Sequence, residues 1–157
     1  MSITGIQKSY LAGFIDGDGS IYVKLTKNND YKYGYQVCPY VVLYQSSINE
    51  WLLKKIQKII DMGYIRKRND GVTECIIGRT DSIKKLMKWI KPYALLKQKQ
   101  IKLMLDILEA KKKVKNKKDF LELCKLIDYF KALNYSKRRT NTSKKVKIAL
   151  DKKLITP

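Results

Sequence analysis

The chain has 157 residues, of which 45% are hydrophobic and 10% aromatic, so it is long and apolar enough for one folded domain and is not a disordered chain. Its 34 lysines and arginines against 14 acidic residues give a formal charge of +20, which makes a polyanion, nucleic acid first, the expected partner. No apolar run approaches the roughly 18 residues that a membrane span needs, and the absence of histidine excludes imidazole as a metal ligand or general base.

The N-terminal part of the chain predicts one helix and two strands. The helix is expected over Ile6–Asp16 and is ended by a pair of glycines. Strict alternation of apolar and polar residues over Ser20–Asn28 predicts a strand, and a polar turn then leads into a second strand, Tyr35–Gln45. Pro39 lies inside this second strand and cannot donate to a ladder, so we expect an edge position or a bulge there.

A second helix is expected next, because Ser47 and Glu50 have the spacing of a capping box. Two short strands, Tyr64–Arg68 and Val72–Ile77, follow and flank an Asn-Asp-Gly turn that predicts a hairpin. The apolar residues of the second helix form a stripe at helical spacing, made up of Ile48, Trp51, Leu52, Ile56, Ile59 and Ile60.

Helical patterns dominate the remainder. One helix begins near Thr80 or Asp81 and ends before Pro92. The lysine-rich stretch 111–118 is either a solvated connector or a set of phosphate contacts. The helix that begins near Thr80 or Asp81 should turn Ile83, Leu86, Met87 and Ile90 inward. Three more helices are predicted at Gln98–Ala110, Asp119–Asn134 and Ser143–Lys152.

The order of these elements predicts an α+β fold. An αββαββα core over about residues 6–91 contains a four-stranded antiparallel sheet, and a C-terminal helical segment over about 97–157 completes a single domain. The polar face of such a sheet is often only solvated, but here it mixes tyrosines with side chains that read base edges in a major groove. The candidate contacts are Tyr22, Lys24, Thr26, Asn28, Gln36, Tyr40, Arg66 and Arg68.

Two carboxylates and several small residues lie close together at the end of the first predicted helix. Gly13 and Gly17 are four residues apart on one helix face, where a second helix could approach closely. Asp18 falls at the expected helix end, and its carboxylate with a nearby backbone carbonyl would suit Mg²⁺, although Asp and Gly are also common in ordinary turns. Because this motif occurs once, the second helix of such a pair has to come from a second copy of the chain.

The run Leu11–Gly19 resembles the signature of the LAGLIDADG homing endonucleases, and the order of strands and helices resembles their αββαββα core. The likeness extends to the single-motif, homodimeric branch encoded in group I introns, through Gln45 ahead of Trp51, the segment Lys97–Gln100, and Leu133–Lys137. It departs from that branch after the glutamine, where Asn49 replaces a residue that is often basic.

This resemblance implies roles for individual residues. Asp18 would be the metal-binding catalytic carboxylate, the Gly17 carbonyl would help to position Mg²⁺, and Mn²⁺ is expected to substitute. Gln45 and Lys97 would order water and stabilise charge at the phosphate, and Asp16 would be structural. The implied dimer interface comprises Leu11, Ala12, Gly13, Asp16 and Gly17. Further DNA contacts are expected at Asp30, Tyr31 and Cys38, with Ser136 and Lys137 from the C-terminal stretch.

The resemblance therefore implies a homodimer that hydrolyses both strands of a long, near-palindromic double-stranded DNA target, without a small-molecule cofactor. An intron RNA maturase on the same fold, a non-cleaving DNA-binding regulator and a basic ribosomal-type RNA-binding protein are the alternatives. Three cysteines without a CxxC pair favour free thiols over structural zinc or disulfides. No targeting peptide is visible, and abundant Lys, Ile, Asn and Tyr are typical of an AT-rich genome, so we expect synthesis inside a chloroplast or mitochondrion.

Overall fold

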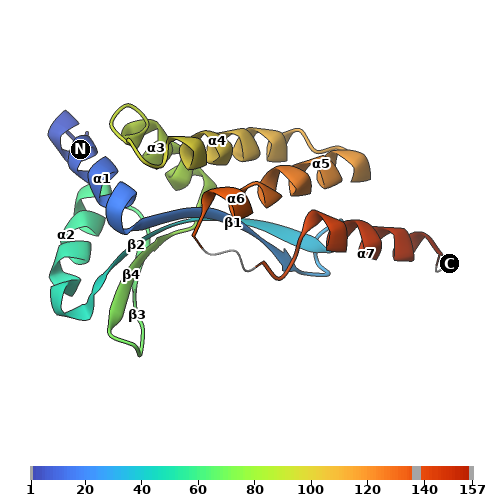
Figure 1. Ribbon diagram of the computed structural model, residues 1–157, viewed down its shortest axis with the longest axis horizontal. Helices are drawn as coiled ribbons and strands as arrows, with labels where there is room; N and C mark the ends of the chain where they lie inside the picture. The colour runs from blue at the N-terminus through green and yellow to red at the C-terminus, as the bar shows by residue number, and fades with distance from the viewer. Residues whose placement is uncertain (1, 136–138, 156–157) are drawn as a thin grey trace.

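An antiparallel sheet with helices on one face makes up the computed structural model, which describes residues 2–135 and 139–155 (Figure 1). Its four strands lie in the order β1-β2-β4-β3 and are β1 (Gly19–Lys27), β2 (Tyr35–Ser46), β3 (Tyr64–Lys67) and β4 (Val72–Ile77). The helices are α1 (Gly5–Asp18), η1 (Ser47–Asn49), α2 (Glu50–Ile60), α3 (Thr80–Ile90), α4 (Gln98–Lys112), α5 (Lys117–Asp128), α6 (Phe130–Leu133) and α7 (Ser143–Ile155). The predicted α+β class and the order of the core elements are confirmed.

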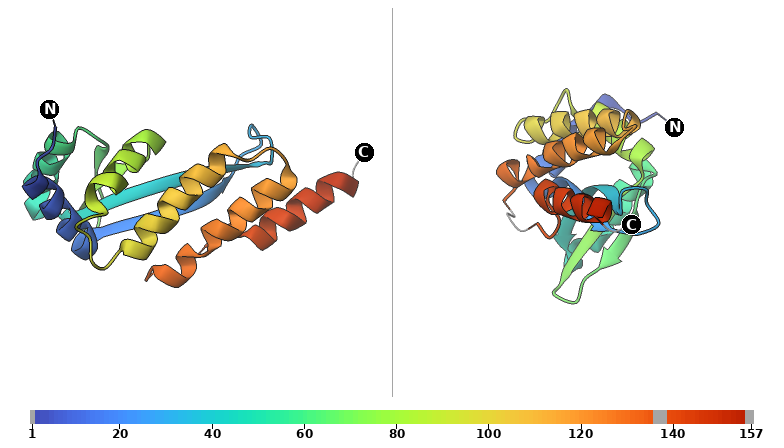
Figure 2. Two further views of the ribbon diagram at one scale, coloured as in Figure 1. Left: turned by 90° about the horizontal axis from the view of Figure 1, so that it is seen from above. Right: turned by 90° about the vertical axis from the view of Figure 1, so that its right-hand side faces the viewer.

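The helices divide into two groups along the sheet. Seen from above, α1 and α2 lie at one end, and α4, α5 and α7 run side by side along the rest (Figure 2). The two groups leave the opposite face of the sheet uncovered by helices (Figure 1).

None of the helices in residues 2–135 and 139–155 has the length and apolar character needed to cross a membrane.

Alternation along the strands separates an inner from an outer face of the sheet. Ile21, Val23 and Leu25 of β1 are buried toward the helices, as predicted. In the antiparallel register these three residues lie opposite positions 41, 39 and 37 of β2, respectively. The buried faces of α3 and α4 close this core, and the four inward positions predicted for α3 are all buried.

Capping differs from the prediction at two places. Thr4 and Gln7 form a capping box on α1, with Thr4 Oγ1 accepting from the Gln7 N–H at 3.2 Å. The box predicted at Ser47 and Glu50 is wrong, since Ser47 lies in η1 and its hydroxyl bonds Thr73 at 2.9 Å. The backbone N–H of Ser47 still donates to the hairpin carbonyl of Gly71, so α2 begins only at Glu50.

This later start also changes which face of α2 is buried. The inner face consists of Leu53, Ile56 and Ile60, so the predicted stripe is correct only in part. Ile48 is 89% exposed and Trp51 is 62% exposed, because η1 and the first turn of α2 point them away from the sheet. Leu52 is partly buried against the core, whereas Ile59 is exposed.

Pro39 occupies an unpaired stretch of an otherwise interior strand. β4 pairs only with residues 41–46 of β2, so at Pro39 the sole neighbour is Val23 of β1. The missing N–H of Pro39 therefore faces an open edge, which confirms the predicted edge position. The ammonium of Lys111 approaches the same edge and donates to the carbonyl oxygen of Val37 at 3.5 Å.

The C-terminal helices show one further correction. The single helix predicted over Asp119–Asn134 is broken at Tyr129 into α5 and α6. Asp128 accepts hydrogen bonds from the backbone N–H and the hydroxyl of Ser143 at the start of α7, and Phe130 is fully buried. These two anchors turn the chain, which a sequence pattern alone does not reveal.

All three cysteines are free, as predicted. Cys75 and Cys124 are buried in the core, and burial raises the pKa of Cys75 to about 11 and that of Cys124 to about 12. Both thiols therefore remain protonated and act as small apolar side chains. Cys38 is only half-buried and lies on the outer face of the sheet.

Candidate active site and nucleic-acid interface

The last turn of α1 presents Asp18 at the start of β1. The helix runs through Asp18 rather than ending at Asp16, and the Gly19 N–H closes it by donating to the Ile15 carbonyl. A Cβ at Gly19 would lie 2.7 Å from the Ile15 backbone, so only glycine lets the strand start this close to the helix. Asp18 is exposed, and within the described residues its carboxylate has no hydrogen-bond or ion-pair partner.

Asp16, two residues before Asp18, is fully engaged. Its carboxylate accepts the backbone N–H groups of Leu95 at 2.6 Å, Leu96 at 3.0 Å and Lys97 at 3.0 Å. Partial burial raises the pKa of Asp16, but these three hydrogen bonds and the Lys97 charge outweigh it and hold the pKa below its ordinary value. Asp16 thus joins the end of α1 to the segment that begins α4, which supports the structural role implied for it.

Lys97 is brought to the same helix end. Its side chain is only 8% exposed, and its ammonium donates to the Asp16 carbonyl at 2.9 Å. The carbonyl end of a helix carries partial negative charge, which explains why this lysine is tolerated in a buried position. An ammonium has three N–H donors, so the contact with Asp16 leaves capacity for another oxygen.

Gln45 reaches this region through the sheet. Gly19 pairs with Leu43, so Gln45 lies two residues past the start of β1, beside the end of α1. Its Oε1 accepts the N–H of Ser46 at 2.9 Å, and it makes no hydrogen bond with Asp18 or Lys97 among the described residues. The structure therefore joins Lys97 to α1 directly and Gln45 to it only by strand register.

The donor set at this helix end fits a hard cation only in part. Asp18 contributes a free carboxylate, and Gly17 contributes a last-turn carbonyl with no donor within the helix. Oxygen donors of this kind suit Mg²⁺, which usually keeps several waters. The described part of the chain contains no group of three or more His, Cys, Asp or Glu that could hold a metal ion. A cation here would need additional ligands from water, a bound phosphate or a second copy.

The outer face of the sheet gathers the residues expected to contact DNA. The register pairs Tyr22 with Tyr40, Lys24 with Cys38 and Thr26 with Gln36. The rings of Tyr22 and Tyr40 are 5.5 Å apart, and the ammonium of Lys24 lies 5.6 Å from the Tyr22 ring centroid. Burial, with a smaller effect of Tyr44, Tyr40 and Glu74, raises the pKa of Tyr22 to about 12, so its hydroxyl stays a donor.

Glu74 organises the arginines on this face and was not among the predicted contacts. It is 4% exposed and accepts from Arg66 Nε at 2.6 Å, and Arg68 Nη1 lies 3.6 Å from its second oxygen. Arg66 and Arg68 remain 58% and 43% exposed, so each keeps N–H donors for a ligand. Glu74 can be identified as the partner of Arg66 once the hairpin register is known, because the two residues pair directly across the strands.

The remaining predicted contacts lie at the far end of the sheet. Asn28 accepts the N–H of Asp30 at 3.0 Å in the turn between β1 and β2, and Tyr31 in this turn is 45% exposed. The Cys38 Sγ lies 3.8 Å from the Thr26 hydroxyl. Ser136 and Lys137 lie outside the described residues.

One face of α1 is left exposed. Ile6, Tyr10, Gly13 and Gly17 follow one another at helical spacing; Ile6 is 85% exposed and Tyr10 is 54% exposed. Nothing lies within 4 Å of the position of a Cβ on Gly13 or Gly17. Another chain could therefore approach the helix backbone closely along this face.

Leu11 and Ala12 belong to the opposite face of α1. They are 2% and 0% exposed within their own chain. Their side chains pack in the core of this subunit, and the predicted contact of these two positions with a partner stays a prediction.

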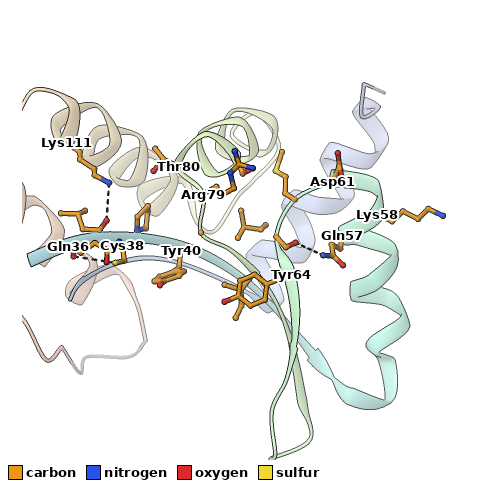
Figure 3. Close-up of a pocket in the computed structure, with 18 residues that line it drawn as sticks. Gln36, Cys38, Tyr40, Gln57, Lys58, Asp61, Tyr64, Arg79, Thr80 and Lys111 are labelled. Carbon is orange, nitrogen blue, oxygen red and sulfur yellow. Dashed lines mark hydrogen bonds between the residues drawn. The ribbon is translucent and has the colours of Figure 1, made fainter. Parts of the chain in front are cut away.

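Two hollows border the sheet. The larger, about 1190 Å³, follows the open edge of β1 and is lined by Lys97 together with Tyr22, Lys24 and Thr26. The smaller, about 790 Å³, lies at the open edge of β2, and its lining includes Tyr40, Tyr64, Arg79 and, at one end, Lys111 (Figure 3). Only the larger hollow combines a predicted catalytic residue with predicted DNA contacts.

Known proteins resemble this chain in sequence. The profile of the LAGLIDADG endonuclease family matches residues 11–110. The DNA endonuclease I-CreI of Chlamydomonas reinhardtii is 38% identical over 143 residues, which cover 90% of this chain and 87% of that protein. The DNA endonuclease I-CvuI of Chlorella vulgaris is 36% identical over 145 residues, with coverage of 92% and 89%.

Solved structures share the arrangement as well. A crystal structure of the homing endonuclease I-CvuI in complex with a DNA target superposes with a TM-score of 0.88 at 33% identity and covers 94% of both chains. An archaeal homing endonuclease, I-Vdi141I, at 18% identity and a TM-score of 0.83, shares the fold. The family match over most of the αββαββα core, the two relatives and the position of Asp18 at the end of α1 agree: this chain belongs to the LAGLIDADG endonuclease family.

Proposed function

We propose that this endonuclease is a homodimer that uses Mg²⁺ to cut both strands of a long, near-palindromic double-stranded DNA target. The exposed carboxylate of Asp18, free among the described residues, carries the proposal. It lies two residues after the Asp16 carbonyl that Lys97 contacts, and directly before β1, whose outer face carries basic and aromatic residues. The relative I-CvuI has been crystallised with DNA targets, in one case with Mg and in another with Ca. Those complexes support double-stranded DNA and a divalent cation for this chain.

The homodimer rests on the exposed face of α1. Gly13 and Gly17 would let the same helix of a second copy approach, with Ile6 and Tyr10 adding apolar area. Leu95 and Leu96, which Asp16 holds by their N–H groups, are 88% and 63% exposed and extend the apolar surface. A two-fold arrangement of this kind would bring two Asp18 carboxylates near one axis, one for each DNA strand.

Each residue at the end of α1 has a definite task in this scheme. When bound, Mg²⁺ lowers the pKa of an attacking water and stabilises the leaving 3′ oxygen. Asp18 and the Gly17 carbonyl would hold it, and Mn²⁺ would be accepted by the same oxygens. Lys97 would use its remaining N–H donors on the phosphate, and the amide of Gln45 would orient water. Because the chain has no histidine, the proton of the water would pass to solvent.

The outer face of the sheet would read the target. Side chains such as Arg66, Arg68, Lys24 and Gln36 suit base edges in a major groove, each good contact contributing about 1–3 kcal/mol of discrimination. Two copies together carry a formal charge of about +40, so binding should weaken steeply as salt rises. Two half-sites read by identical faces would make the target nearly palindromic.

We further propose that the chain is encoded in a group I intron and made inside an organelle, for which its two algal relatives are the support.

The test is a cleavage screen on a diverse pool of circular DNA. Wild type and Asp18→Asn are each incubated with Mg²⁺ or with EDTA, and the linear molecules are sequenced. Linearisation by the wild type alone, only with Mg²⁺ and at one near-palindromic site, is the expected result. Salt-sensitive binding without linearisation would contradict the proposal and favour a maturase or a regulator, for which intron RNA is the next ligand to test.

A further inference from the structure

The open edge of β1 is covered by side chains instead of by another strand. β1 is the outermost strand on its side of the sheet, so its outward carbonyl groups have no neighbouring strand. Three of them, at every second residue, each accept a hydrogen bond from a side chain of the segment that follows α6. The pairs are Asn134 Nδ2 with Ile21 O at 3.0 Å, Arg139 Nη2 with Val23 O at 2.5 Å and Asn141 Nδ2 with Leu25 O at 2.6 Å.

The spacing of these bonds matches that of a strand pairing. Residues 21, 23 and 25 of an extended strand point their carbonyl groups to one edge, and an added strand would satisfy them with backbone N–H groups. Here side chains supply the donors, and the described residues 139–142 form no strand. The edge is thereby closed to pairing with another chain, while β1 is held along most of its length.

The segment is itself anchored at both ends. At its start, Gln100 Nε2 donates to the Leu133 carbonyl at 3.0 Å, and Gln100 lies in the first turn of the helix that begins after Lys97. At its end, the Asp128 carboxylate accepts from the Ser143 N–H at 3.1 Å, where α7 begins. The bonds to β1 therefore connect the strand to the helices and to the neighbourhood of Lys97.

Arg139 stands out because a basic residue here would ordinarily be assigned to a DNA phosphate. It is half-buried, and the hydrogen bond to Val23 directs its guanidinium at the strand edge. Burial lowers its pKa, and the nearby Asp128 opposes that effect. Arginine stays charged even so, and its charge is used on a backbone carbonyl inside the protein.

We infer that Arg139, with Asn134 and Asn141 on either side, is a positioning residue for DNA recognition that holds the reading strand β1 in place and makes no phosphate contact. Tyr22 and Lys24 flank Val23 and point to the outer face. A hydrogen bond that holds the Val23 carbonyl therefore also holds the backbone from which both side chains project. This inference rests on the proposed function, because it names what positions the residues that would read the target.

The experiment compares Arg139→Gln with Asn141→Ala in the full-length chain. Asn141→Ala removes one bond to β1 without changing the charge, so it separates positioning from electrostatics. Arg79→Gln is the matched control, because it removes one exposed arginine charge at the opposite, β2 edge of the sheet. Lys24→Ala marks the base pairs that β1 reads, and Arg66→Ala marks those read by the β3–β4 hairpin.

The first readout needs no DNA. Amide hydrogen exchange over Gly19–Lys27 should become about 10-fold faster in Arg139→Gln and Asn141→Ala, with β3 and β4 unchanged and Arg79→Gln like the wild type. Unchanged exchange in β1 would overturn the inference. This outcome is independent of whether the chain cuts DNA, so a failure of the proposed function is distinguishable from a failure of this one.

The second readout uses the duplex recovered from the circular pool, bound without Mg²⁺ over a salt series, and its single base-pair variants. Both variants should lose about 5-fold or more discrimination at the base pairs marked by Lys24→Ala and none at those marked by Arg66→Ala. The slope of log affinity against log salt should be unchanged in Arg139→Gln. A slope shallower by about two, one charge for each subunit of the proposed homodimer, with base preference intact, would overturn the inference in favour of a phosphate contact.

Discussion

The end of α1 and the outer face of the sheet both present charged side chains, but they are prepared in different ways. At the helix end, Asp16 takes three backbone N–H groups and leaves its neighbour Asp18 without a partner among the described residues. On the sheet, Glu74 instead holds Arg66 and Arg68, which remain partly exposed. The helix end leaves one carboxylate without a partner among the described residues, whereas the sheet holds its arginines in ion pairs. A carboxylate that is to bind a cation must have no partner within the protein, whereas side chains that are to read base pairs must be held in one position.

Asp18→Asn tests the isolated group and should have the largest effect. Loss of the carboxylate removes the main cation ligand, so DNA cleavage with Mg²⁺ should fall by about 10³-fold or more. The free energy of unfolding should stay within about 0.5 kcal/mol of the wild type, because Asp18 is exposed. Single-turnover cleavage and urea unfolding measure the two quantities. A variant that cuts at the wild-type rate would remove Asp18 from the catalytic role.

Asp16→Asn tests the carboxylate that accepts three backbone N–H groups, and it should lower both the cleavage rate and the free energy of unfolding. An amide oxygen cannot accept all three N–H groups, so the free energy of unfolding should drop by about 1–3 kcal/mol. Cleavage should fall about 10-fold, because the segment that carries Lys97 loses its anchor. Asp151→Asn, on the exposed surface of α7, is the matched control. Equal stability of the two variants would show that Asp16 does not hold the segment.

Glu74→Gln tests the recognition groups on the sheet. Removal of the carboxylate releases Arg66 and leaves Arg68 with Asp70 as its partner, so discrimination at the base pairs that Arg66 reads should weaken most and stability should fall by about 1–2 kcal/mol. Glu122→Gln, which loses only an exposed pair with Lys125, provides the comparison. Base-pair substitution profiles of cleavage measure the effect. A profile identical to that of the wild type would mean that the arginines are positioned by other contacts.

Gly13→Ala should change the stability of the isolated subunit and the association of the dimer in opposite directions. Alanine is the better helix former by up to about 1 kcal/mol, and nothing within the chain lies near its added methyl group, so the isolated subunit should gain stability. The dimer should dissociate at higher concentration, because the helices can no longer approach as closely. Sedimentation over a dilution series detects this change. Tighter association of the variant would contradict the assignment of this face.

The pH dependence of stability should show the smallest effect. The pKa of Asp16 in the folded chain lies below its ordinary value of 3.8, so its ionised form stabilises the fold above that value. This contribution is lost as the pH falls through the lowered folded pKa. The difference in unfolding free energy between the wild type and Asp16→Asn should therefore shrink as the pH falls through 3.8 and on through the lowered folded pKa. A difference that is constant with pH would assign the effect of the variant to shape alone.

Local patterns predicted the strands and most helices, because burial on one face imposes a period that the chain itself displays. Ile21, Val23 and Leu25 alternate and are buried, and the inward positions of α3 recur at helical spacing. The same reasoning was wrong for α2, where Ile48 and Trp51 looked like core. Which face of an amphipathic stretch is buried depends on where the helix starts, and the hydrogen bonds of Ser47 to Thr73 and Gly71 delay that start.

The residues of the candidate site also fall into those that the sequence pointed to and one that it missed. Resemblance of the motif at the end of the first helix to a known signature pointed to Asp18 and Gly17 as candidate metal ligands and to a structural role for Asp16, since a short run of residues carries that signature. Glu74 was missed because its importance comes from facing Arg66 across a hairpin, which is a matter of strand register.

By itself, the sequence determined the charge, the αββαββα order, the absence of histidine and the residues of the family motif, all of which can be read directly along the chain. Only the tertiary structure decided that the carboxylate of Asp16 is bound and that of Asp18 is free among the described residues, and that Lys97 contacts the end of α1. It also decided that the side chains of Asn134, Arg139 and Asn141 cover the edge of β1. Those contacts join residues 79 to 116 positions apart. Such long-range pairings arise when packing brings remote backbone groups together, and no local pattern encodes them.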